Sequence, residues 1–106
     1  MKNFILCLLF VFVFSPTKAQ NSIRGKITDN LNSPLSFANI ILLQKGNETY
    51  IKGVVSDDKG NYLFEDIENG TYQLEVSVLG FETKKTEEVE LLKNKVADFI
   101  LAEEAQ

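Results

Sequence analysis

Residues 57–81, DDKGNYLFEDIENGTYQLEVSVLGF, contain the pattern that most restricts how this chain can fold. Apolar residues occupy every second position from Tyr72 to Val78, and polar residues stand between them. Successive side chains of an extended strand point to opposite faces, so this segment would bury one face and expose the other. A second short run, Tyr62 to Phe64, precedes it. We therefore predict two consecutive antiparallel strands here, which form a central hairpin.

Each of these runs begins just after a glycine in a polar cluster, at Lys59-Gly60 and Asn69-Gly70. Glycine reaches positive φ without steric cost, and Asn and Asp hydrogen-bond the nearby backbone, so both dipeptides indicate turns. The surrounding carboxylates and amides also suggest calcium, which binds several oxygen ligands. They are Asp57, Asp58, Asn61, Glu65 and Asp66. Their spacing does not match a twelve-residue EF-hand loop, so the sequence favours ordinary turns and no metal site.

Further strands are predicted on both sides of this stretch, over residues 22–29, 35–44, 50–56 and 96–102. Residues 82–92 are mostly charged and fit either a solvated helix or an edge strand. About seven short strands at intervals of roughly ten residues are typical of an all-β sandwich. The predicted fold is a seven-stranded antiparallel Greek-key β-sandwich.

The segment Leu35–Gln44 differs from the other predicted strands because both of its faces are apolar. One face would carry Ala38, Ile40 and Leu42, and the other Phe37, Ile41 and Leu43. A helix is the alternative, but the flanking Pro34 and Gly46 favour a strand. Only one face of a strand meets the core of a two-layer sandwich, so a loop, a terminus or another molecule must cover the second face. Phe37, Ile41 and Leu43 are therefore our candidate partner surface, although cover from within the chain is the commoner explanation.

The chain begins with a short basic lead and an unbroken apolar run, FILCLLFVFVF, at residues 4–14. This run is about half of the ~20 residues that span a bilayer as a helix, and it fits the core of a secretory signal peptide. Pro16 and the small residues Thr17 and Ala19 indicate cleavage after Ala19, although an uncleaved membrane anchor is the alternative. We predict export, a signal peptide at residues 1–19, the sandwich domain at 20–103, and the start of a linker or tail at 104–106.

Residue types exclude several classes of function. The chain has no histidine, and its only cysteine, Cys7, lies in the predicted leader, so nucleophilic catalysis and zinc hydrolysis lack their residues. We predict no catalytic residue and no cofactor. The formal net charge of −4 opposes binding to phosphate backbones, so nucleic acid is not an expected partner. Carbohydrate platforms need exposed coplanar aromatic rings, and the alternating pattern assigns most of this chain's aromatic residues to the core.

Five segments, taken in order, resemble the carboxypeptidase regulatory-like domain. They are GKITD at 25–29, PLSFANI at 34–40, GVVSDDKGNYLF at 53–64, NGTYQLEV at 69–76 and GF at 80–81. The resemblance covers Ser22 to about Glu103 and implies a transthyretin-like, or prealbumin-like, sandwich of seven strands. It implies no carboxypeptidase activity, because the metal ligands and catalytic acid of carboxypeptidases belong to a separate domain.

The same resemblance implies a location and a kind of partner. In bacteria of the Bacteroidetes type, this domain commonly follows a signal peptide in TonB-dependent receptors, ahead of the plug and the outer-membrane β-barrel. Residues 101–106 resemble the linker toward the plug. The expectation is a periplasmic or outer-membrane location, with a protein partner such as the plug, the barrel or an associated lipoprotein, and membrane contact only through a barrel. The alternatives are a stand-alone carbohydrate- or peptide-binding module and a structural spacer.

Overall fold

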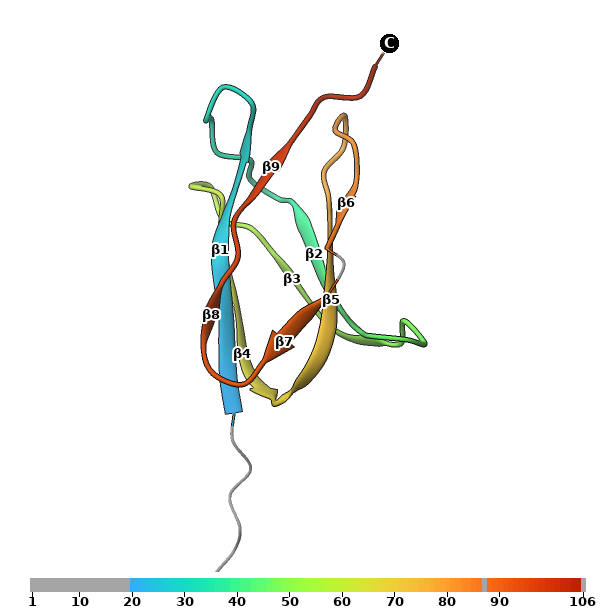
Figure 1. The fold of residues 1–106 in the computed structure, drawn as a ribbon. Helices are drawn as coiled ribbons and strands as arrows, with labels where there is room; N and C mark the ends of the chain where they lie inside the picture. Colours follow the sequence, from blue (N-terminus) through green and yellow to red (C-terminus); the bar gives the residue numbers. More distant parts are fainter. Residues whose placement is uncertain (1–19, 87, 106) are drawn as a thin grey trace, which may run out of the picture.

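Two β-sheets pack face to face in the computed structural model, which describes residues 20–86 and 88–105 (Figure 1). The predicted signal peptide, residues 1–19, lies outside the described residues. Across the part of the chain that is described, no helix is long and apolar enough to cross a membrane.

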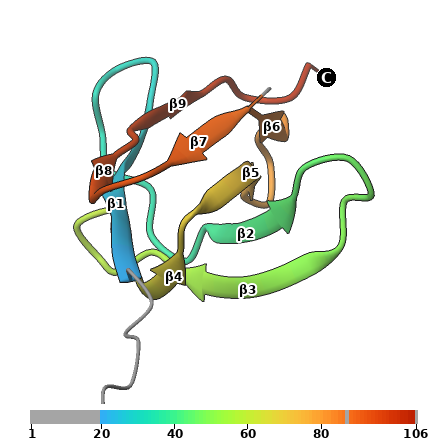
Figure 2. The same ribbon diagram turned by 60° about the horizontal axis from the view of Figure 1, so that its bottom comes forward.

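The first sheet is centred on β1 (Gln20–Asp29), which pairs with β4 (Asn61–Glu68) on one side. On its other side β1 pairs with two short segments, β8 (Lys95–Val96) and β9 (Phe99–Leu101). The second sheet runs from β3 (Tyr50–Val55) through β2 (Asn39–Gln44) to β5 (Gly70–Ser77). The far side of β5 pairs with β6 (Lys84–Lys85) and β7 (Val89–Leu91). Figure 2 shows β2 and β3 side by side in this second sheet.

β6 and β7 both pair with the same side of β5, and β8 and β9 both pair with the same side of β1. The nine segments therefore occupy seven strand positions. The predicted all-β sandwich is confirmed. Pairing differs from the prediction at the last position, where β8 and β9 run parallel to β1 instead of antiparallel. The chain passes from β7 into β8 at the end of the molecule where β1 begins, so both strands leave that end in the same direction (Figure 1). The other strand pairings are antiparallel.

The predicted central hairpin is wrong, although both of its strands exist. β4 pairs with β1 and β5 pairs with β2, so the turn at Asn69-Gly70 carries the chain from one sheet to the other. Asn21 of β1 holds this corner, since its side-chain amide donates to the carbonyl of Ile67 at 3.3 Å and to Oδ1 of Asn69 at 2.7 Å. Local alternation specifies which face of a strand is buried, but it does not specify the neighbouring strand.

The core is formed by the inward faces of both sheets, as the alternation predicts. Its fully buried large residues are Ile23, Ile27, Ile40, Leu42, Phe64, Leu74, Val76, Leu91 and Leu101. Within residues 82–92, for which a helix was the alternative, β6 and β7 are edge segments of the second sheet. Gly25 allows the last part of the chain to pack closely on β1, because a Cβ there would lie 1.8 Å from the carbonyl oxygen of Ala97.

Candidate interaction surface

The outer face of the second sheet carries apolar side chains on its central strand. β2 lies between β3 and β5, with Ile40 and Leu42 buried in the core. Ile41 and Leu43, which the sequence assigned to the opposite face, are half-buried. Successive residues of a strand alternate between faces, so these two side chains lie on the outside of the sheet. The doubly apolar pattern therefore belongs to a central strand whose second face is only partly covered.

Two residues of β3 extend this apolar region toward the edge of the sheet. Leu43 is paired with Tyr50, which is 61% exposed, and Ile41 is paired with Gly53. A Cβ on Gly53 would lie 2.9 Å from the hydroxyl oxygen of Tyr50, so the missing side chain at Gly53 makes room for this tyrosine. Val55 follows two residues later on the same face and is 55% exposed.

We call Ile41, Leu43, Tyr50 and Val55 the outer strip. Three of its residues, Ile41, Tyr50 and Val55, line a shallow depression together with Ser77 of β5. On the β5 side its neighbours are polar, with Glu75 opposite Ile41 and Gln73 opposite Leu43. The strip is therefore apolar with polar neighbours on its β5 side, and an apolar centre beside a polar rim is the usual arrangement of a protein interface.

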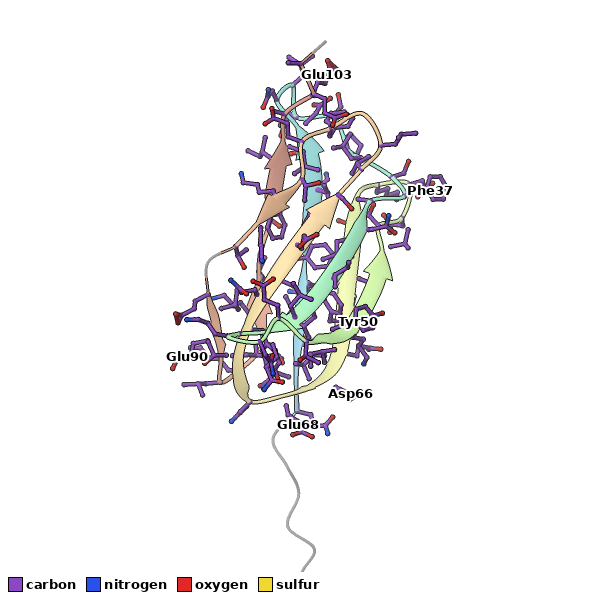
Figure 3. All side chains as sticks on the ribbon, turned by 90° about the vertical axis from the view of Figure 1, so that its right-hand side faces the viewer. Phe37, Tyr50, Asp66, Glu68, Glu90 and Glu103 are labelled. Atoms are coloured by element: carbon purple, nitrogen blue, oxygen red, sulfur yellow. The ribbon has the colours of Figure 1, made fainter. Side chains whose placement is uncertain are left out.

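Phe37 does not belong to this strip. The strand predicted to begin at Leu35 begins at Asn39, and Ser36 and Phe37 form a turn before it. Phe37 has a φ of 59° and is 77% exposed, and Figure 3 shows it projecting from the side of the molecule. The structure thus brings Ile41 and Leu43 together but places Phe37 beyond the end of the strand.

Ser56, just after β3, fixes the conformation of this turn. Its hydroxyl accepts a hydrogen bond from the amide of Ala38 at 2.9 Å and donates one to the carbonyl of Leu35 at 2.8 Å. Its backbone carbonyl accepts the amide of Phe37 at 3.1 Å, and its own amide donates to the carbonyl of Ala38 at 3.0 Å. Ser56 is only 2% exposed, so the buried hydroxyl is fully used in holding the turn.

Sequence reasoning assigned no role to Tyr50 or Ser56 in this region. Tyr50 had a usable signal, because it begins a predicted strand beside an apolar one. Ser56 had none, since the partners of its hydroxyl lie 18 and 21 positions away in the chain.

Two of the three tyrosines lie in the core and hydrogen-bond the backbone, so they are not placed to stack on a sugar ring. Tyr62 and Tyr72 are buried, and their hydroxyls donate to the carbonyls of Ala97 at 2.5 Å and Glu68 at 2.8 Å. Burial, and secondarily the charge of Asp98, raises the pKa of Tyr62. Burial, followed by the charge of Glu68, also raises the pKa of Tyr72. Tyr50 alone among the three tyrosines is exposed, so no pair of them forms a stacking platform.

In the acidic turn before β4, the first carboxylate, that of Asp57, accepts hydrogen bonds from the backbone of the turn itself. Oδ1 of Asp57 accepts the backbone amides of Lys59 at 2.9 Å and Asn61 at 2.8 Å. These two bonds, with Asn61 contributing more, lower the pKa of Asp57. Such bonds are the ordinary reason for aspartate in a turn. Among the described residues, no cluster of three or more His, Cys, Asp or Glu side chains could hold a metal ion.

A family model described as "Carboxypeptidase regulatory-like domain" matches residues 22–102. No curated protein matches the chain. Among solved structures, 5-hydroxyisourate hydrolase of Klebsiella pneumoniae is similar with a TM-score of 0.64 at 14% identity, over 80% of this chain and 93% of that one. A chain of the type II cohesin-X-dockerin complex of Acetivibrio cellulolyticus gives 0.58 at 18% identity, over 76% and 56%.

Catechol 1,2-dioxygenase from Pseudomonas arvilla C-1 is also similar, with a TM-score of 0.67 at 10% identity over 87% of this chain. The chain spans only 53–61% of the length of this and three related dioxygenase structures. Identities this low show a shared fold and carry no information about activity.

Proposed function

The chain belongs to the carboxypeptidase regulatory-like domain family, whose members are generally non-catalytic, and we propose that it is an exported module that binds another protein of the cell envelope. In this proposal it is the N-terminal periplasmic extension, or a fragment, of a TonB-dependent outer-membrane receptor. Its partner is then the plug, the barrel or an associated lipoprotein. The signal-peptide pattern of residues 1–19 supports export.

The observation that carries this proposal is the outer strip. Tyr50 and Val55 are more than half exposed on the outer face of the sheet, beside the half-buried Ile41 and Leu43. An apolar patch of this kind with a polar border marks an interaction site more often than a random part of the surface. Aromatic residues such as Tyr50 are also enriched among those that dominate binding energy.

A double variant, Tyr50→Thr with Val55→Thr, tests the strip, since threonine is β-branched and favours strands. Its affinity for the isolated plug and barrel is measured by calorimetry against the unchanged module. We expect binding at least about tenfold weaker, which corresponds to about 1.4 kcal/mol. Leu63→Thr is the control, because Leu63 is similarly exposed on β4 of the other sheet. Unchanged affinity in a stably folded double variant would refute the strip as the binding site.

Location is tested by separate means. Fractionation of the producing cells, followed by N-terminal sequencing, should find the protein in the envelope with Gln20 as its first residue. A cytoplasmic product that retains Met1 would contradict export.

A further inference from the structure

Phe37 combines two properties that are rarely found together. Its φ of 59° lies in the left-handed region, where a bulky side chain is strained and glycine or asparagine is not. Its side chain is 77% exposed, so the domain gains little burial in return for this strain. A residue that costs stability and contributes little to the core points to a role outside the domain.

The surrounding structure enforces this conformation. Four hydrogen bonds connect Ser56 to the turn at residues 35–38, and two of them use its buried hydroxyl. Strained backbone persists only where neighbouring contacts determine it in this way. Ser56 therefore acts as a positioning residue that holds Phe37 out of the core.

A second apolar residue lies at the same end of the β2–β5 ladder. Asn39, the first residue of β2, is paired with Ser77, the last residue of β5, so Phe37 stands two residues before β2 and Leu79 two residues after β5. Leu79 is 99% exposed. We call Phe37 and Leu79 the apolar tip. It is distinct from the outer strip, which lies on the face of the sheet.

Acidic residues outnumber basic ones around the tip, where Lys59 directly follows Asp58 and Lys84 lies two positions after Glu82. Asp57 and Asp58 directly follow Ser56, and the amide of Glu104 donates to the carbonyl of Gly80 at 2.9 Å, next to Leu79. The amide of Glu82 donates to the carbonyl of Ala102 at 2.8 Å. All four of these acidic residues are exposed. Figure 3 shows Phe37 and Glu103 toward the same end of the molecule. A complementary surface would therefore be basic around an apolar centre.

From these observations we propose that Phe37 anchors the apolar tip in an apolar pocket of a partner protein whose rim carries Lys or Arg side chains. The proposal rests on the proposed function for the class of partner, but it assigns a different surface. The acidic charge around the tip disfavours two other binding partners, an anionic lipid surface and a second copy of this chain. Acidic residues are repelled by anionic lipid headgroups, and a second copy of the tip would bring like charges together.

The first test concerns strain and needs no partner. Phe37→Gly and Phe37→Asn should unfold at the same urea concentration as the unchanged protein or at a higher one, because both residues adopt positive φ more easily. Leu31→Gly is the control, since Leu31 is similarly exposed but does not have positive φ. Leu31→Gly should lower the urea concentration at the midpoint of unfolding. A lower midpoint in both Phe37 variants would show that Phe37 stabilises the domain, and it would overturn the proposal.

The second test concerns docking and uses the full chain in the cells that produce it. A photoreactive benzoylphenylalanine replaces Phe37, and in separate proteins Tyr50 or Leu92, an exposed residue just after β7. After irradiation, mass spectrometry identifies each adduct. We expect position 37 to give a protein adduct at an apolar segment flanked by Lys or Arg, with a yield that falls as salt rises. Position 92 should give none.

The outcomes separate the tip from the strip. An adduct from position 50 without one from position 37 overturns the tip and leaves the proposed function standing. No protein adduct from either position overturns both. An adduct to lipid alone from position 37, or equal protein adducts from positions 37 and 92, would also refute the tip as a protein-docking site.

Discussion

Replacing Ser56 by alanine removes one buried hydroxyl and nothing else. The amide of Ala38 loses its acceptor at 2.9 Å, and the carbonyl of Leu35 loses its donor at 2.8 Å. Ala38 is fully buried, so its amide cannot readily turn to water. A buried polar group left without a partner costs about 1–3 kcal/mol. We expect Ser56→Ala to lower the free energy of unfolding by about 2 kcal/mol, near the middle of that range.

Urea unfolding followed by circular dichroism measures this loss directly. The midpoint should fall while the dependence on urea stays the same, because the surface exposed on unfolding is unchanged. In a thermal scan each kcal/mol corresponds to about 4–8 °C for a domain of about this size. Ser77→Ala is the matched control. Ser77 is half-buried on β5, and its loss should change stability by no more than about 0.5 kcal/mol.

A loss below about 0.5 kcal/mol in Ser56→Ala, within the range of ordinary surface substitutions, would refute this reasoning. It would mean that water or a small shift of the turn satisfies both backbone groups. Ser56 would then not determine the conformation of Phe37, and the account of a turn held under strain would lose its support.

Two further predictions concern the contacts that Ala97, between β8 and β9, makes with β1 and β4. Gly25→Ala should destabilise the domain by about 3 kcal/mol in urea unfolding, because its Cβ would meet backbone atoms of Ala97 at 1.8 and 2.6 Å. Gly46→Ala, which meets nothing within 4 Å but has a φ of +101°, should lose only about 1 kcal/mol, and equal losses would contradict the packing argument. Tyr62→Phe should lose about 1 kcal/mol at neutral pH with the hydrogen bond to Ala97. Burial raises the pKa of Tyr62 above its ordinary value of 10.0, so above that pH the unfolded chain loses a proton that the folded protein keeps. Stability of the unchanged protein should therefore fall as the pH rises past this value, and less so in Tyr62→Phe; urea midpoints with the same pH dependence in both proteins would contradict this account.

The strands and their buried faces could be predicted from the sequence because they depend on a local period of two. Leu74 and Val76 are buried where the alternation places them, and so are Leu91 and Leu101. Part of the candidate surface followed from the same rule. With Ile40 inside, its neighbour Ile41 had to face outward in an extended strand.

Tertiary contacts decided which strands pair and where the exposed aromatic residues stand. β4 and β5 adjoin in sequence but belong to different sheets, where β4 pairs with β1 and β5 with β2, strands that are distant in the chain. Phe37 continues the apolar pattern of Ile41, yet it lies in a turn that Ser56 holds. The hydroxyl of Ser56 bonds the backbone of this turn at residues that lie 18 and 21 positions before it in the chain. Periodicity determines what one strand buries, whereas a hydrogen bond between distant segments forms only after the chain has brought them together.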